Sequence, residues 1–456
     1  MTGYLDRLGD FLAGCRYESL PDAVVARTKL VLADTVATIA AGAQEPEMRR
    51  LSGQILGDSA GGPAAVLGTG RRAEPMTAAL LNGTAGTFLE LDEGNQFSRG
   101  HPGIHAVPAA LARAEAGRHG GRDLVTATVL GYEIGARIGI AGRIRPSMHP
   151  HGTWGTVGAA VAAAWLGRAD AETMVRVVNI ASTLGLATSR QTMLQGGTVR
   201  NSFAGVSGQL GLHAWELARA GFTGERDGLA TIWGKVVSES FDPDAMVAEL
   251  GERWEITRNY FKRHACCRYN HGTLDALMEI IAGRPGGLAP GDVAAVEVAT
   301  YSLAAELSDQ HPANTLAAKF SVPFAVATAI VNRSTGLDSF TWEKVRDQAV
   351  QTLAARVTVR EEPRLTAMMP RFRPAEVTVR LTDGTVLTAA ATTNRGDSED
   401  PYDAPELRRK YDELMARVVA PATAEAIHRE IMAIDALADV GQLTRRLDGT
   451  GAQQAA

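Results

Sequence analysis

Residues 88–114 read FLELDEGNQFSRGHPGIHAVPAALARA, and a polar loop in this stretch interrupts apolar sequence on both sides. An apolar run precedes the loop and apolar residues at helical spacing follow it, so the loop is inserted where a buried core begins. It contains three carboxylates (Glu90, Asp92, Glu93) and two imidazoles (His101, His105). Histidine titrates near neutral pH, and a neighbouring carboxylate can fix its tautomer and raise its basicity. The loop is therefore typical of an acid/base site, and a solvated helix end is the alternative for Asp92 and Glu93.

Helical patterns dominate about the first 260 residues. Apolar residues recur at helical spacing after Pro21 and again in 123–138. Residues 156–166, TVGAAVAAAWL, contain enough small side chains for very close helix packing. The first of these patterns predicts one buried stripe, made of Val25, Leu32, Val36 and Ile39. We expect the amino-terminal body to be α-helical.

The pattern changes after about residue 285, where GRPGG (283–287) is a cluster of helix-breaking residues. Residues 293–300 alternate like a strand, and 376–381 pairs plausibly with 385–390 across the turn pair Asp383-Gly384, a hairpin signal. From Pro405 onward helical patterns return, and we expect these helices to pack back onto the first body.

These patterns predict a mainly α fold with two domains. A large all-helical domain is expected to be discontinuous and to contain residues 1–265 and 400–445. A smaller α/β lid domain is expected to contain residues 266–399. Residues 446–456 are expected to form a flexible tail.

Composition excludes some classes of ligand and indicates the cellular compartment. The net charge of -5 is small for 456 residues, and like charges do not form long blocks, so neither a nucleic-acid patch nor a membrane-binding face is indicated. No stretch reaches the roughly 18 apolar residues of a membrane span, and the amino terminus lacks a signal-peptide pattern. Three cysteines (Cys15, Cys266, Cys267) suit neither a disulfide framework nor a zinc site. We expect a soluble, cytoplasmic protein that binds a small molecule.

Two histidine segments are candidate sites. His101 and His105 stand four apart, which on one helix face would suit a metal pair, but Pro102 and Gly103 place His101 at the turn before the helix. We favour a catalytic His101 over a metal ligand or a structural histidine. His149 lies in MHPHGTWGT (148–156), before a small-residue helix whose first amides attract a negative group, and its alternative is a structural histidine.

Two cationic segments are further candidates. Arg200 follows a flexible Gly196-Gly197 pair and can grip a carboxylate with both arms of its guanidinium, or form a surface ion pair. The segment KRHACCRYNH (262–271) begins with Lys262, contains Cys267 and precedes the change of pattern. Clefts between domains commonly hold ligands, although basic hinge residues are the alternative. The context of the two adjacent cysteines does not identify a nucleophile.

Short motifs in the same order and spacing across more than half of the chain resemble the MmgE/PrpD family. This family includes 2-methylcitrate dehydratase, cis-aconitate decarboxylase and iminodisuccinate epimerase. The motifs are LLNGTA (80–85), LDE (91–93), HP (101–102), GYE (131–133), HP (149–150), GFTG (221–224), Lys262 with Cys267, and FSVPF (320–324).

The resemblance implies a large helical domain built from both chain ends, a smaller α/β lid domain, a homodimer, and catalysis without a metal or an organic cofactor. It also implies that Asp92, His101, His149 and Lys262 lie in the active site. Two positions depart from the family pattern: lysine is common where Arg200 stands, and the cis-aconitate decarboxylase branch has histidine where Cys267 stands. These departures favour another reaction over decarboxylation of cis-aconitate.

The leading hypothesis is a cofactor-independent lyase of the dehydratase type that acts on a small di- or tricarboxylate by abstracting a proton next to a carboxylate. His101, oriented by Asp92, moves the proton and His149 is the partner acid. Arg200 and Lys262 hold carboxylates, and Cys267 belongs to the substrate-binding set. An epimerase of the iminodisuccinate epimerase type needs the same proton abstraction, and a non-catalytic carboxylate-binding protein is the third hypothesis.

Overall fold

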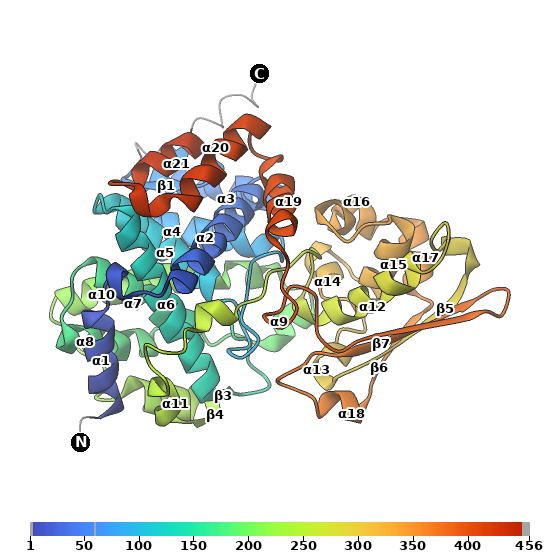
Figure 1. Ribbon diagram of the computed structural model, residues 1–456, viewed down its shortest axis with the longest axis horizontal. Coiled ribbons are helices and arrows are strands. Elements are labelled where there is room, and N and C mark those ends of the chain that lie inside the picture. The colour runs from blue at the N-terminus through green and yellow to red at the C-terminus, as the bar shows by residue number, and fades with distance from the viewer. Residues whose placement is uncertain (1–2, 59–60, 449–456) are drawn as a thin grey trace.

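The computed structural model describes residues 3–58 and 61–448. Helices make up most of it, so the prediction of a mainly α fold is confirmed. Figure 1 shows a helical body on one side and a part that mixes helices with a sheet on the other.

The elements of the amino-terminal body are mostly helices, several of which begin at a proline. They are α1 (Tyr4–Gly14), the 3₁₀ turn η1 (Tyr17–Ser19), α2 (Asp22–Gly42), α3 (Pro46–Leu56), β1 (Ala64–Val66), β2 (Arg71–Ala73), α4 (Pro75–Phe88), α5 (Pro102–Ala116), α6 (Gly121–Ala141), β3 (Gly142–Ile144), α7 (Gly155–Leu166), α8 (Ala171–Thr183), α9 (Arg190–Leu194), the 3₁₀ turn η2 (Thr198–Ser202), α10 (Phe203–Arg219), the π-helix η3 (Leu229–Val237), β4 (Ser238–Phe241), α11 (Pro243–Val247) and η4 (Glu255–Arg258).

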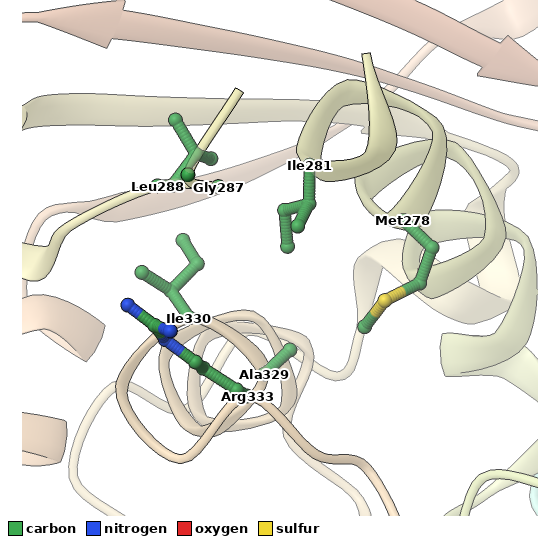
Figure 2. Close-up of a pocket in the computed structure, with 8 residues that line it drawn as sticks. Met278, Ile281, Gly287, Leu288, Ala329, Ile330 and Arg333 are labelled. Atoms are coloured by element: carbon green, nitrogen blue, oxygen red, sulfur yellow. The ribbon is translucent and has the colours of Figure 1, made fainter. Parts of the chain in front are cut away.

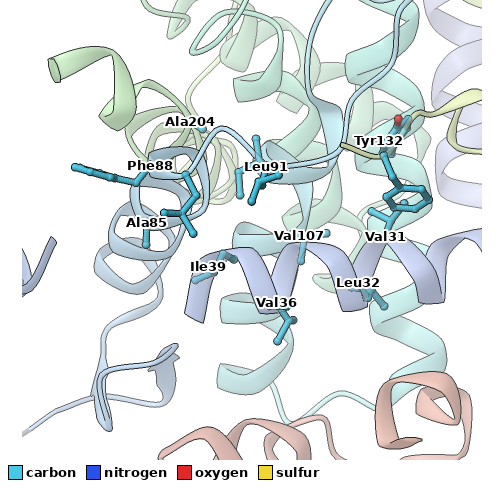
Figure 3. Close-up of a cluster of buried hydrophobic side chains, with 14 of the residues drawn as sticks. Val31, Leu32, Val36, Ile39, Ala85, Phe88, Leu91, Val107, Tyr132 and Ala204 are labelled. Carbon is cyan, nitrogen blue, oxygen red and sulfur yellow. The ribbon is translucent and has the colours of Figure 1, made fainter. Parts of the chain in front are cut away.

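The core of this body is formed where α4, α5, α6, α7 and α10 pack on one another. Every residue of α7 is buried, as its run of small side chains predicted. The stripe predicted on α2, which contains Val36 and Ile39, is also buried. Figure 3 shows Val36 and Ile39 in one buried cluster with Ala85 and Val107 of neighbouring helices. Close approach of helix backbones through small residues thus builds the support for the loop after α4.

One detail of the predicted all-helical domain is wrong, because the body contains two small antiparallel ladders. β1 pairs with β2, and β3 pairs with β4 nearly one hundred residues further along the chain. Each strand is only three or four residues long, too short to produce an alternating pattern. The partner of β3 is distant in sequence and leaves no local signal.

The second part is built on a four-stranded sheet with the order β6-β5-β7-β8. β5 (Val293–Thr300) pairs in parallel with β6 (Val357–Glu361) and antiparallel with β7 (Ala375–Leu381), which forms a hairpin with β8 (Val386–Ala391). The predicted strand 293–300 and the predicted hairpin are confirmed. The helices of this part are η5 (Arg268–Asn270), α12 (His271–Ala282), η6 (Pro290–Asp292), α13 (Ser302–Ala305), α14 (Thr315–Lys319), α15 (Val322–Val331), η7 (Leu337–Phe340), α16 (Trp342–Val345), α17 (Gln348–Ala354) and α18 (Pro363–Thr366).

The carboxyl-terminal helices return to the amino-terminal body. α19 (Ala404–Met415) and α20 (Pro421–Met432) pack on α2, and η8 (Ile434–Ala436) packs on α6 (Figure 1). α21 (Gly441–Asp448) continues three residues into the predicted tail 446–456, and residues 449–456 lie outside the described residues. The boundaries of the two predicted domains stay a prediction.

Among the described helices, α6 is long and apolar enough to span a membrane by length and composition. Its apolar window is 89% buried inside the protein, where it packs on α5 and α7. The composition of α6 is therefore that of a core helix.

The closeness of α10 and α4 predicts the effect of one methyl group. A Cβ at Gly205 would lie 2.1 Å from the carbonyl oxygen of Leu80 and 2.3 Å from Oγ1 of Thr84. We expect Gly205→Ala to lower the free energy of unfolding by about 1–3 kcal/mol, because backbone must move. Gly53→Ala is the matched control: a Cβ there meets nothing within 4 Å, so the better helix propensity leaves stability unchanged or higher. Urea denaturation measures both, and equal midpoints would contradict the packing argument.

Candidate active site

A cavity lies where loops of the helical body meet residues of the α/β part. Four of the six predicted site residues line it: His101, His149, Arg200 and Cys267. They come from four separate stretches of the chain, as the hypothesis of one shared site requires. Asp92 lies beside the His101 ring, and Lys262 lies beside Asp92.

The loop that carries Asp92 and His101 is held by backbone pairing. The amide of Gly94 donates to Tyr260 O and the amide of Tyr260 donates to Gly94 O, at 3.0 and 2.7 Å. A side chain at 94 would collide with the Tyr260 ring, since a Cβ there would lie 2.4 Å from the phenol oxygen. This pairing brings the segment that contains Lys262 alongside the loop, although about 170 residues separate them.

The position of His101 at the N-terminus of α5 fixes its tautomer. Nδ1 lies 2.7 Å from the carbonyl oxygen of Glu93 and 3.0 Å from Oδ2 of Asp92. Both neighbours are acceptors, so Nδ1 carries the hydrogen of the ring. This hydrogen is directed at the Glu93 carbonyl oxygen, and Asp92 acts on the His101 ring through its negative charge. Among residues 3–58 and 61–448 no hydrogen-bonding partner engages Nε2. The ring therefore offers Nε2 to the cavity as a base.

Asp92 is a charged acceptor inside the protein. Burial alone would raise the pKa of this carboxyl, but the His101 ring when it is protonated and the ammonium of Lys262 hold it below its usual range. Lys262 Nζ lies 3.4 Å from Oδ1 of Asp92 and 3.8 Å from Oε2 of Glu90, and its side chain is completely buried. The ammonium thus faces carboxylates of the protein, and Lys262 is not among the cavity-lining residues in the described chain.

Glu93 anchors the start of α5. Its Oε1 accepts from the amide of Gly103 at 2.8 Å, and its Oε2 accepts from the Tyr132 hydroxyl and the Asn259 amide at 3.0 and 3.1 Å. Burial raises the pKa of Glu93 to about 7. All three contacts are internal, so we interpret Glu93 as a residue that positions His101.

His105, like His101, directs Nδ1 at a backbone carbonyl oxygen, but its Nε2 is also engaged. Its Nδ1 lies 2.8 Å from the carbonyl oxygen of His101, and its Nε2 accepts from the amide of Gly152 at 3.2 Å. Burial lowers the pKa of His105 to about 4, so the ring is neutral. His105 ties α5 to the loop before α7, and its two nitrogens do not converge with His101 on a metal.

His149 and His151 complete a cluster of imidazoles. The ring centre of His151 lies 4.6 Å from that of His101 and 5.1 Å from that of His149. Nδ1 of His149 accepts from the amide of His151 at 3.1 Å, which leaves the hydrogen of the neutral ring on Nε2. Burial lowers the pKa of both rings well below the usual range. Neutral His149 is therefore a hydrogen-bond donor.

One group of possible metal-binding atoms appears among the described residues. Asp92, His101 and His151 each place one such atom within 4.8 Å of the others. Asp92 and His101 already engage each other through Oδ2 and Nδ1. We interpret this group as part of the acid/base unit, and the predicted absence of a metal stays a prediction.

Arg200 and Cys267 line the cavity with different chemistry. Arg200 is 2% exposed and pairs with Glu90, while its Nε has no hydrogen-bonding partner among the described residues. Glu90 takes a positive φ of 55°, a strained conformation of the kind found at functional sites. Burial raises the pKa of the Cys267 thiol to about 11, so it is neutral near pH 7. Arg200 is thus held in a pair and is not a surface residue.

A buried ion pair between two helices that are distant in the sequence holds the loop that carries Asp92. Lys410 of α19 contacts Asp34 of α2 and donates to the carbonyl oxygen of Leu91 at 2.6 Å. Oδ2 of Asp34 accepts from the amide of Glu93 at 3.2 Å. The two peptide groups that flank Asp92 are therefore both fixed by this pair.

Several cavity residues were not predicted. They are Glu90, Arg99, His151, Arg190, Tyr260, Arg268 and Arg373, among others. His151 stands in the HPH segment beside His149 and could have been found there. Arg373 follows α18 in a stretch without any motif, so nothing local marks it. Its contribution depends on the packing of the two parts of the molecule.

A second cavity lies between α12 and α15. Figure 2 shows Met278, Ile281, Leu288 and Ile330 around it, with Arg333 as its one charged side chain among the described lining residues. Without a carboxylate or an imidazole it offers no acid/base pair. Of these two cavities, the first is the one lined by imidazole and carboxylate side chains.

The fold and the first cavity define a class: a mainly α protein with paired acid/base groups in an arginine-rich cavity. Residues 6–245 match the MmgE/PrpD N-terminal domain and residues 264–436 match the MmgE/PrpD C-terminal domain. The chain belongs to the MmgE/PrpD family.

Relatives of known name cover nearly the whole chain. A cis-aconitate decarboxylase-like protein of Aspergillus oryzae is 24% identical over 460 residues, which are 94% of each chain. A cis-aconitate decarboxylase of Aspergillus terreus is 22% identical over 474 residues, 98% of this chain and 96% of the relative. The human cis-aconitate decarboxylase is 22% identical over 396 residues, 83% of this chain and 80% of the relative.

Replacement of Lys410 tests whether its buried ion pair with Asp34 stabilises the protein. We expect Lys410→Met to lower the free energy of unfolding by about 3–5 kcal/mol, because Asp34 is left buried and unpaired. The double variant Asp34→Asn/Lys410→Met recovers part of this loss, since no charge then lacks a partner. Urea denaturation provides the measurement, and exposed Lys235→Met is the matched control. A Lys410→Met protein as stable as the Lys235→Met protein would show that the pair is not important.

Proposed function

We propose that the protein is a cofactor-independent lyase of the dehydratase type that acts on a small di- or tricarboxylate. The observation that carries the proposal is the orientation of His101: its Nδ1 hydrogen is held by Glu93 O beside Asp92, so Nε2 faces the cavity as a base. The arginines that line the same cavity suit an anionic substrate. The names of the relatives support a carboxylic acid as the substrate.

In the proposed first step, His101 Nε2 takes a proton from the carbon next to a substrate carboxylate. The C–H bond breaks, an N–H bond forms, and the electron pair moves into the carboxylate-stabilised carbanion. Asp92, 3.0 Å from Nδ1, stabilises the imidazolium that results. In this proposal Lys262 contacts Asp92 and not the substrate, and its ammonium keeps Asp92 ionised.

In the second step the C–O bond of the neighbouring carbon breaks, and the electron pair of the carbanion forms a carbon-carbon double bond. The departing hydroxide takes the proton from His101 Nε2, so water leaves and the base is restored. Neutral His149 donates a hydrogen bond from Nε2 to the departing oxygen, in agreement with the tautomer that the amide of His151 imposes. Arg200 offers its free Nε to a substrate carboxylate. Cys267 contributes shape and a neutral thiol, because a pKa of about 11 leaves little thiolate at neutral pH.

Decarboxylation and dehydration of a polycarboxylate both pass through a carbanion next to a carboxylate, so the names of the relatives agree with the proposed intermediate. The cis-aconitate decarboxylase branch has histidine at the position of Cys267. The Cys267 thiol cannot replace that imidazole as a proton donor near pH 7. This difference favours dehydration in our proposal. The homodimer and the cytoplasmic location implied by the resemblance remain predictions.

Substitution of His101 tests the proposed base. We expect His101→Gln to lower kcat by about 10²–10⁴-fold, because proton transfer by a positioned group is worth that factor. The exposed His213→Gln is the matched control and leaves turnover unchanged. Turnover is followed by NMR over a panel of di- and tricarboxylates that includes hydroxy acids and cis-aconitate. Equal rates for the two variants would contradict the role of His101.

The same reactions in D₂O separate the alternatives. Loss of water with a new alkene signal supports the proposed lyase. Deuterium entry with inversion and no alkene identifies an epimerase, and release of carbon dioxide from cis-aconitate identifies a decarboxylase. A rise in melting temperature with tricarboxylates, without any turnover, identifies a binding protein.

A further inference from the structure

The arginines of the cavity differ in whether an acid neutralises them. Among the five that line it, three form ion pairs: Arg190 with Glu306, Arg200 with Glu90, and Arg268 with Asp397. The other two, Arg99 and Arg373, have no acidic partner within residues 3–58 and 61–448. The cavity therefore holds two guanidinium groups that form no ion pair with a carboxylate of the described protein.

Arg373 is the more deeply placed of the two. It is 5% exposed, its Nη2 donates to the carbonyl oxygen of Gln96 at 3.3 Å, and its buried Nη1 has no hydrogen-bonding partner among the described residues. Its guanidinium lies 5.7 Å from the ring centres of both Tyr260 and Tyr269. The two rings and the Gln96 carbonyl hold the guanidinium in place, so its free edge has a defined position.

Arg99 approaches from the helical body. It lies in the loop closed by pairing of Asn95 with Gly100 and takes a positive φ of 59°, a conformation that a non-glycine residue rarely adopts. Its side chain is half-buried, and no hydrogen bond or ion pair engages its guanidinium within the described chain. Arg373 stands just before β7, so the two cations come from different parts of the molecule.

A buried guanidinium nitrogen without a hydrogen-bonding partner is unfavourable, since burial removes its hydration and, at Nη1 of Arg373, no described group replaces it. A carboxylate suits the free edge of such a group, because two parallel N–H···O bonds satisfy both oxygens. Arg200 already serves the region near His101. We propose that Arg373 and Arg99 form a second carboxylate subsite, which receives the carboxylate remote from the reacting carbon and so selects di- and tricarboxylates over monocarboxylates.

This inference rests on the proposed function for the identity of the reacting carbon, but the subsite can be measured without turnover. The probe is propane-1,2,3-tricarboxylate, which has neither a hydroxyl group nor a double bond, and binding is followed by calorimetry. We expect Arg373→Gln to raise the Kd by roughly 10–100-fold, the range for loss of a charged hydrogen-bonded contact. Arg373→Lys keeps the charge without the fork and recovers part of the affinity.

Arg371→Gln is the matched control: it removes the same charge two residues away, on an exposed side chain, and leaves the Kd unchanged. Butanoate is the second probe, and its affinity is the same for the unaltered protein and Arg373→Gln. If Arg373→Gln does not fold by circular dichroism, Arg99→Gln takes its place with the same expected loss for the tricarboxylate. Equal tricarboxylate Kd values for the unaltered protein and the tested variant overturn the subsite.

The outcomes distinguish the subsite from the proposed reaction. Tricarboxylate binding that depends on Arg373, without turnover of any acid in the panel, supports the subsite and overturns the lyase. Turnover that depends on His101, with the same KM in Arg373→Gln, supports the lyase and overturns the subsite. Failure of the unaltered protein to bind the tricarboxylate overturns the subsite as well.

Discussion

The loop that carries Asp92 and His101 is held from the side of α2 by a buried pair, Lys410 with Asp34. The two side chains come from opposite ends of the chain, and together they fix the carbonyl of Leu91 and the amide of Glu93 on either side of Asp92. A buried ion pair adds little net stability, because desolvation opposes the attraction, but it specifies geometry. The packing of the carboxyl-terminal helices on α2 is thus connected to Asp92 through a few hydrogen bonds.

The imidazoles near Asp92 are also fixed, each in one tautomer. His101 points its Nδ1 hydrogen at a carbonyl beside Asp92, whereas His149 accepts at Nδ1 and keeps its hydrogen on Nε2. The two rings are therefore prepared as a base and a donor before any ligand binds. Preorganised groups need no rearrangement during reaction, which is where enzymes gain most of their electrostatic advantage. His105 contributes by joining the two loops through its own pair of bonds.

The sequence predicted what local periodicity and short motifs encode. The helices, the strand 293–300, the hairpin and the loop with Asp92 and His101 all follow from patterns within about twenty residues. The β3–β4 ladder and the burial of Lys410 depend on contacts between distant segments, and no local pattern reports them. Lys262 shows the limit for sites: its presence near the loop was predicted, but its contact with Asp92 follows only from the packing.

His151 shows how the cavity combines these constraints. Its ring lies between those of His101 and His149, it is 1% exposed, and neither nitrogen has a hydrogen-bonding partner among the described residues. Burial keeps it neutral, so it can donate through one nitrogen and accept through the other. A hydroxy acid offers both an acceptor and a donor, whereas a carboxylate alone offers only acceptors. The unpaired nitrogens of His151 therefore agree with the hydroxylated polycarboxylate of our proposal, from which water is eliminated.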